Sequence, residues 1–201
     1  MSHHSVVVVV EDDLSEAVMR RLIVEANQSL KIDRIINERG NQMIRVGMQE
    51  KYPSASHVIP HIILTDLDQI ACAPTLINFW HANNSPSRLL FRVAVRETES
   101  WLLADRHGVA GFLAVPVARI PANPETLPDP KRVLINLARR SRKLRLAQEI
   151  VPAPGSAAPI GPFYNARLSE FVASSWNVDE ARRTAPSFNR AFERVAEFLQ
   201  N

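Results

Sequence analysis

The sequence predicts an α/β fold with a mostly parallel sheet and helices on both faces. Short runs rich in Val, Ile and Leu alternate with longer segments of helical periodicity, in the order β-α-β-α-β-α-β-α. This alternation favours parallel strands that are joined by crossover helices. The first run, residues 6–10, is valine at every position, as expected for a strand that is buried on both of its faces.

The remaining elements follow from apolar spacing and from helix-start signals. Further strands are expected at residues 31–36, 61–68 and 89–95, and helices at residues 13–27, 40–51, 74–82 and 98–104. Asp13, with Glu16 three residues later, has the pattern of a capping box at the start of the first helix. Each of the first four strands is therefore expected to lead into a helix.

The composition changes after Val115, where prolines occur at positions 116, 121, 124, 128 and 130. We therefore expect an α/β domain at residues 1–115 and a basic, helical C-terminal extension at residues 116–201 that packs on it. Within the extension, one long basic helix is predicted at residues 131–150. Shorter helices are expected at residues 166–173, 178–183 and 187–200.

Composition limits the compartment but not the activity. The chain has 201 residues, 46% hydrophobic content and a formal net charge of +3, which is compatible with a polyanionic partner without requiring one. Its single cysteine, Cys72, excludes an intrachain disulfide and a cysteine-built zinc site, so a reducing compartment is expected. No apolar run approaches the roughly 20 residues that span a bilayer. These features predict a cytoplasmic protein without a membrane segment.

Carboxylates stand at the ends of two predicted strands. Glu11 follows the first strand, and Asp66 and Asp68 end the third. Residues two apart in a strand point to the same side, and parallel strands bring their carboxyl ends to one edge of the sheet. Because Mg²⁺ prefers oxygen ligands, the pattern predicts a site for Mg²⁺ or Mn²⁺ that is held by these three residues. The alternative is that the acids only cap helices, as expected for Asp13.

The acidic residues and their surrounding sequence resemble two known families. The run of valines followed by Glu-Asp-Asp resembles the opening of a bacterial response-regulator receiver domain, in which Asp66 would be the phosphorylated residue. A receiver also needs a lysine at a later strand end, and the chain has no lysine between Lys51 and Lys131. The resemblance to a receiver domain is therefore the weaker of the two resemblances.

The stronger resemblance is to the topoisomerase-primase (TOPRIM) fold, whose pattern is a glutamate after the first strand and Asp-x-Asp after a later one. Glu11 and Asp66-Leu67-Asp68 match that pattern. Together with Glu16 and the decapeptide from Arg96 to Asp105, Arg-Glu-Thr-Glu-Ser-Trp-Leu-Leu-Ala-Asp, they closely resemble the bacterial family numbered 4276 among domains of unknown function. That family is similar to the nuclease half of the overcoming-lysogenization-defect (OLD) proteins.

The resemblance implies Mg²⁺-dependent cleavage of phosphodiester bonds. Glu11 would act as acid/base or metal ligand, Asp66 and Asp68 as metal ligands, and Glu99 as a further catalytic ligand. It also implies a phage-defence setting with an AAA or ABC-type ATPase as partner. One departure is Asp12, which stands where many relatives have glycine. The alternative to a nuclease is a non-catalytic module that regulates or binds such an ATPase.

Clustered basic residues form the second expected functional surface. The residues expected to bind nucleic acid are Arg96, Lys131, Arg139, Arg140, Arg142 and Lys143. Clustered Arg and Lys neutralise backbone phosphates, and Lys131 would be a catalytic cation if its helix packs over the acidic edge. A partner-protein contact and a plain solvated face are the alternatives.

Overall fold

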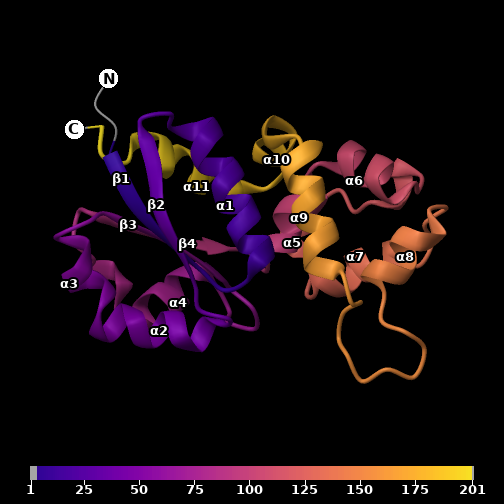
Figure 1. Cartoon of the computed structure of the whole chain (residues 1–201), viewed down its shortest axis with the longest axis horizontal. Coiled ribbons are helices and arrows are strands. Elements are labelled where there is room, and N and C mark those ends of the chain that lie inside the picture. Colours follow the sequence, from indigo (N-terminus) through magenta and orange to yellow (C-terminus); the bar gives the residue numbers. More distant parts are fainter. Residues whose placement is uncertain (1–3, 201) are drawn as a thin grey trace.

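The computed structural model describes residues 4–200 and confirms the predicted α/β class with a four-stranded, fully parallel sheet (Figure 1). The strands are β1 (His4–Val10), β2 (Leu30–Asn37), β3 (His61–Asp66) and β4 (Leu89–Ala94). They lie in the order β2-β1-β3-β4. The chain leaves β1 toward β2 and leaves β3 toward β4 in the opposite direction, so a crevice for ligands is expected between the carboxyl ends of β1 and β3.

Helices follow each strand and fill the C-terminal part. The first group is α1 (Asp13–Ala26), α2 (Asn41–Glu50), α3 (Tyr52–Ser56), α4 (Ala73–Phe79), α5 (Thr98–Ala104) and α6 (Arg106–Leu113). The second group is α7 (Pro130–Ala138), α8 (Leu144–Ile150), α9 (Tyr164–Ser174), α10 (Val178–Thr184) and α11 (Pro186–Glu197). Within residues 4–200, no helix is long and apolar enough to cross a membrane. The cytoplasmic location stays a prediction.

Helices cover both faces of the sheet, as the sequence predicts. Val6, Val8 and Val10 face one buried cluster, which they share with α1 and α11. Val7 and Val9 face the other cluster, which contains side chains of α2, α3 and α4. Figure 1 shows α2, α3 and α4 together on one side of the strands and α1 and α11 on the other. The alternation of side chains along β1 therefore feeds both cores at once.

The C-terminal helices share a core with the sheet. The Phe188 ring of α11 lies 5.0 Å from the Trp101 ring of α5 and 5.0 Å from the Trp176 ring, measured between centroids. The Trp101 indole N–H donates to the Ser187 hydroxyl (2.7 Å). One buried cluster thus contains residues from both sides of position 115. The division into two units at that position stays a prediction, whereas the packing of the extension on the sheet is observed.

The predicted single helix at residues 131–150 is wrong, because the structure has two helices there. The Ser141 N–H donates to the Ala138 carbonyl (3.0 Å), and the Ser141 hydroxyl accepts from the Lys143 N–H (3.0 Å). A serine that binds nearby backbone groups in this way competes with the helical pattern. Leu144, which begins the second of these helices, is 75% exposed.

Two local predictions at the carboxyl edge also need correction. The helix begins at Asp13, so the extended residue before it, Asp12, is the cap, and its carboxylate accepts from the Ser15 N–H (2.8 Å). Asp13 instead accepts from the Asn37 amide (2.9 Å). The third strand ends at Asp66, two residues earlier than predicted, because Asp68 has a left-handed backbone with φ of 50°.

We predict that Asp105 ties the two groups of helices together. Its buried carboxylate accepts from the Gly108 N–H (2.9 Å), which caps α6, and from the Asn177 N–H (2.8 Å). Asp105→Ala removes a cap and leaves two N–H groups without their acceptor, so unfolding should become easier by about 2–4 kcal/mol. Chemical denaturation measures this change.

Asp129→Ala is the matched control. Asp129 also caps a helix, since its carboxylate accepts from the Arg132 N–H (2.7 Å), but the residue is only partly buried. Among the described residues, that carboxylate accepts from no second backbone N–H. Its loss should cost about 1 kcal/mol. Equal effects of the two substitutions would contradict the linking role of Asp105.

Candidate metal centre

Glu11 and Asp66 meet at the crevice between the two central strands. The Glu11 Oε1 atom accepts hydrogen bonds from the Thr65 hydroxyl and from the Asp66 N–H (2.8 Å). The side chain also lines a surface depression with Asp12, Asn37 and other residues, which opens it to solvent. The end of β1 is therefore joined to the end of β3 through one carboxylate oxygen.

Asp66 connects the sheet to α5. Its Oδ1 atom accepts from the Thr98 N–H (2.9 Å) and from the Thr98 hydroxyl (2.8 Å). The side chain lies against the first turn of the helix, where the partial positive charge of the helix terminus favours a carboxylate. Burial is the main reason that the pKa of Asp66 lies well above its usual range, and the charges of Glu11 and Glu99 raise it further.

Asp68 lies in the loop after β3 and not at the end of the strand, where it was predicted. It follows the strand rather than continuing it, so the two-residue alternation within a strand does not orient it. Its Oδ2 atom accepts from the Asn41 amide at the start of α2 (2.6 Å). Burial raises the pKa of Glu11 to about 7, and the charge of Asp68 raises it further. The loop after β3, and not the strand itself, therefore carries Asp68.

Glu99 lies beneath this edge and is almost fully buried, with 1% of its surface exposed. Its Oε1 atom accepts from the Tyr164 hydroxyl (2.9 Å) and lies 3.5 Å from the Lys131 ammonium. Burial raises the pKa of Glu99 to about 7, while the charge of Lys131 works in the opposite direction. The sequence predicted a role for Glu99 but gave no sign of Tyr164, which is 65 positions away.

Lys131 meets the condition under which it was expected to act at this site, because the start of α7 packs over the acidic edge. Its N–H donates to Glu97 Oε2 (2.9 Å), and its ammonium faces Glu99. The charges of Glu99 and Glu97 raise the pKa of Lys131 above its ordinary value, against the effect of burial. Glu97 therefore holds the helix start while Glu99 faces the cluster.

The other predicted basic residues are not gathered here. Arg96 donates to the backbone carbonyls of Asp68 (2.9 Å) and Ile70 (2.7 Å), so it supports the loop that carries Asp68. Lys143 donates to the carbonyls of Gly111 (3.1 Å) and Phe112 (2.9 Å) at the end of α6. Arg139, Arg140 and Arg142 are exposed. Binding of nucleic acid by these residues stays a prediction.

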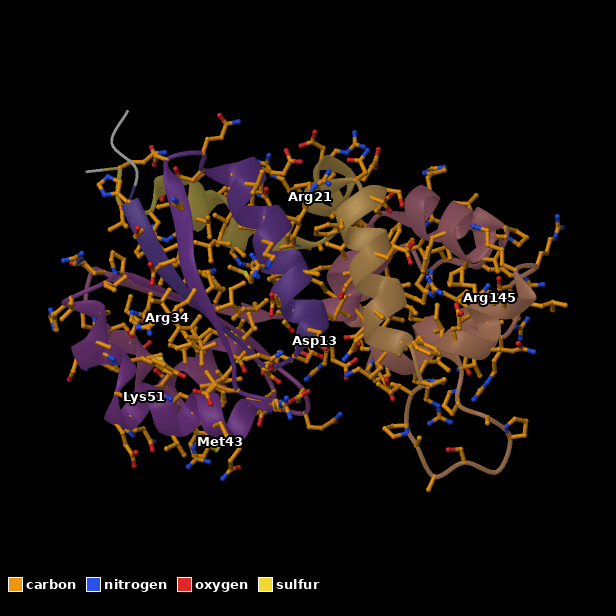
Figure 2. The ribbon with its side chains drawn as sticks, in the orientation of Figure 1. Asp13, Arg21, Arg34, Met43, Lys51 and Arg145 are labelled. Carbon is orange, nitrogen blue, oxygen red and sulfur yellow. The ribbon has the colours of Figure 1, made fainter. Side chains whose placement is uncertain are left out.

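Figure 2 shows how far the basic segment extends from the acidic edge. Asp13 marks the start of α1, beside Glu11 and Asp12, near the middle of the molecule. Arg145, on α8, lies at the side of the helical C-terminal part that is farther from Asp13. It pairs with Glu149 (3.1 Å). The start of α7, and not α8, is therefore the basic part that contacts the acids.

The donor set at this edge fits a hard divalent cation. Glu11, Asp66 and Asp68 each have one carboxylate oxygen that is held by a protein donor, and a second oxygen that accepts no hydrogen bond from the described residues. Within residues 4–200, no three His, Cys, Asp or Glu side chains are close enough together, as they stand, to hold a metal ion. Mg²⁺ does not need such a cage, since it is commonly held by one or two carboxylates, waters and substrate phosphates.

Asp12, whose role the sequence left open, is accounted for by its cap on α1. Thr65, Thr98 and Asn41 are the supporting residues that were missed. Thr65 is adjacent to Asp66, and Thr98 lies between Glu97 and Glu99, so their positions beside acids were an available signal. Asn41 had no such signal, because it meets Asp68 only in the folded chain.

Comparisons of the chain with protein-family models, with curated proteins and with solved structures found no match. The resemblance to the TOPRIM fold and to the family numbered 4276 therefore stays a prediction that rests on the quoted residues.

We predict that the acidic cluster makes the metal-free protein less stable at alkaline pH. The pKa of Glu99 is raised in the folded state, so the folded protein binds more protons than the unfolded chain between about pH 4.5 and 7. The associated stability is present at low pH and is lost as pH rises through about 7. Unfolding in a chelator at about pH 5.5 and pH 8 measures it.

Glu99→Gln should reduce this pH dependence by on the order of 1–3 kcal/mol, because glutamine keeps an acceptor for Tyr164 and carries no charge. Glu50→Gln, at an exposed position of α2, is the control and should leave the pH dependence as in wild type. A Glu99→Gln curve parallel to the wild-type curve would mean that Glu99 is ionised alike in both states.

Proposed function

We propose that this protein is a Mg²⁺- or Mn²⁺-dependent nuclease that cleaves phosphodiester bonds. The observation that carries the proposal is the arrangement of Glu11, Asp66 and Asp68, each with one held and one unengaged carboxylate oxygen at the crevice of a parallel sheet. When bound, a divalent cation would supply Lewis-acid activation of a phosphoryl group and would neutralise its charge.

The chain's own groups have distinct parts in the proposed reaction. Glu11, Asp66 and Asp68 would hold the cation through their unengaged oxygens, and the protein donors to the other oxygens fix the direction of each carboxylate. Glu99 exchanges a proton at its carboxylate, because a pKa of about 7 leaves both protonation states populated near neutral pH. Lys131 places a positive charge where negative charge develops on the phosphoryl oxygens.

The biological setting in the proposal rests on the family resemblance alone. By that resemblance the nuclease works in phage defence, in the cytoplasm, with an AAA or ABC-type ATPase as partner. The non-catalytic alternative assigns the same acids to metal binding or helix capping in a module that regulates the ATPase. The two are separated by Glu11→Gln, which should abolish cleavage and leave formation of a complex with the ATPase intact.

We predict that purified protein cleaves DNA or RNA only when Mg²⁺ or Mn²⁺ is added. Asp66→Asn and Asp68→Asn should each lower the rate by at least about 100-fold, because each removes a charged cation ligand without changing its shape. Mn²⁺ should also raise the melting temperature of wild type and should do so less in both variants, because a bound ion stabilises the folded state.

Asp33→Asn, at an exposed position on β2, is the matched control and should keep wild-type cleavage. Circular dichroism should show the same fold for all three variants. Metal-dependent cleavage at the wild-type rate by the Asp66→Asn variant would sink the assignment of this site.

A further inference from the structure

A groove runs along α7, away from the acidic edge. One wall is α7 with Lys131, Arg132 and Arg139, and the facing wall is the loop at residues 151–160, with the end of α8 between them. The groove has a volume of about 920 Å³. Lys131 lines its inner end and also lies 3.5 Å from Glu99, so the groove leads to the proposed catalytic site.

The loop wall has a defined conformation. Its tip is a turn in which the Ser156 N–H donates to the Ala153 carbonyl (3.0 Å), and Gly155 has φ of 77°. Pro154 before this glycine gives the combination that a type II turn requires. At the base of the loop, the Gly161 N–H donates to the Ile150 carbonyl (2.9 Å). A side chain at Gly161 would come within 2.4 Å of Ile150, so this close approach requires glycine.

The charges in the groove favour an extended polyanion. Arg132 lies on α7, and Arg139 follows the last residue of that helix with a helical backbone conformation. The two are exposed and seven residues apart, which separates them by about 10 Å along the helix axis. That separation covers about three nucleotide steps at the spacing of one strand in B-DNA. Asp129 is the one acid among the lining residues described, and it caps the helix by accepting from the Arg132 N–H (2.7 Å).

The shape of the groove favours one strand over two. Its volume lies in the range of small-ligand pockets, which is too small to enclose a double helix. Among the described residues that line it, none is aromatic. A positively charged groove that follows the backbone without aromatic stacking platforms should bind with little sequence preference and strong salt dependence.

We propose that this groove binds the sugar-phosphate backbone of a single-stranded nucleic acid, with Arg132 and Arg139 on phosphates about three nucleotide steps apart and Lys131 at the catalytic end. The inference rests on the proposed nuclease function for the direction of the strand, whereas binding itself can be measured without cleavage. Arg132 was not among the residues that the sequence singled out.

The test is binding of fluorescein-labelled oligothymidylate in the presence of a chelator, measured by fluorescence anisotropy. Arg132→Gln/Arg139→Gln should bind at least about tenfold more weakly than wild type, since two charge-assisted hydrogen bonds are lost. The slope of log affinity against log salt should become shallower by about 1.4, at about 0.7 for each lost phosphate contact. Oligouridylate should behave in the same way.

Lys31→Gln/Arg34→Gln is the matched control, because it removes two exposed positive charges from the edge strand β2, outside the groove. It should bind as wild type. Arg140→Gln/Arg142→Gln examines the basic segment beside the groove. An equal loss of affinity in either of these variants, equal affinity of wild type for duplex DNA, or no binding of single strands would overturn the groove assignment.

The loop wall gives a second, independent variant. Since the Gly161 N–H meets the Ile150 carbonyl, residues 152–159 can be replaced by a short Gly/Ser linker without moving α8 or α9. This variant should keep the wild-type circular dichroism spectrum and should lose at least about tenfold in affinity for oligothymidylate. Unchanged affinity in a folded loop variant would exclude the loop as a wall of the binding site.

The binding and cleavage experiments together distinguish a failure of the groove proposal from a failure of the proposed nuclease function. If the groove variants bind oligothymidylate as wild type does while Asp66→Asn abolishes metal-dependent cleavage, the groove proposal is wrong and the nuclease function is supported. If the groove variants lose binding and wild type cleaves nothing with Mg²⁺ or Mn²⁺, the groove is supported and the nuclease function is wrong.

Discussion

The proposed site depends on bringing carboxylates together where water is scarce. Glu11, Asp66 and Glu99 come from three different segments, and burial disfavours the charged form of each. Their mutual repulsion adds to that cost, because like charges at a partly buried edge are poorly screened. Every nearby element contributes a donor or a positive charge that reduces the cost.

The compensating groups come from the whole chain. Thr65 and Thr98 donate from the sheet and the start of α5, while Lys131 and Tyr164 come from the C-terminal helices. The C-terminal part is therefore more than a cover for the apolar face of the sheet, since it supplies the cation and the hydroxyl that hold the most buried acid. The packing of this part on the α/β part therefore also sets the charges and hydrogen bonds around Glu99.

The molecule separates negative and positive surfaces in a way that suits a polyanionic substrate. The acids lie at the crevice between the central strands, and Lys131 marks the boundary where α7 begins. Beyond that boundary the exposed charges of the groove are mainly positive. A basic approach to an acidic edge would raise the local concentration of an anion, and in the proposed function a cation at the edge would bind its phosphate. This division of charge connects the proposed chemistry with the proposed groove.

The sequence by itself determined the class of fold, the four strands and the positions of the acids near strand ends. These features are local, because side-chain periodicity and β-branching act over a few residues and the carboxyl ends of parallel strands meet at one edge. Local reasoning was wrong at three positions where a short-range hydrogen bond or one backbone angle, and not the periodicity, decides the conformation. Ser141 ends a helix by binding the backbone, Asp12 replaces Asp13 as the cap, and Asp68 turns out of the strand.

Only the tertiary structure decided which groups meet the acids. Tyr164 and Lys131 reach Glu99 from 65 and 32 positions away along the chain, and Asn41 reaches Asp68 from the start of α2. The groove likewise exists only because the loop at residues 151–160 folds back across from α7. No periodicity encodes such contacts, because they depend on how helices pack on the sheet and on the free energy of burying charge, both of which are properties of the assembled molecule.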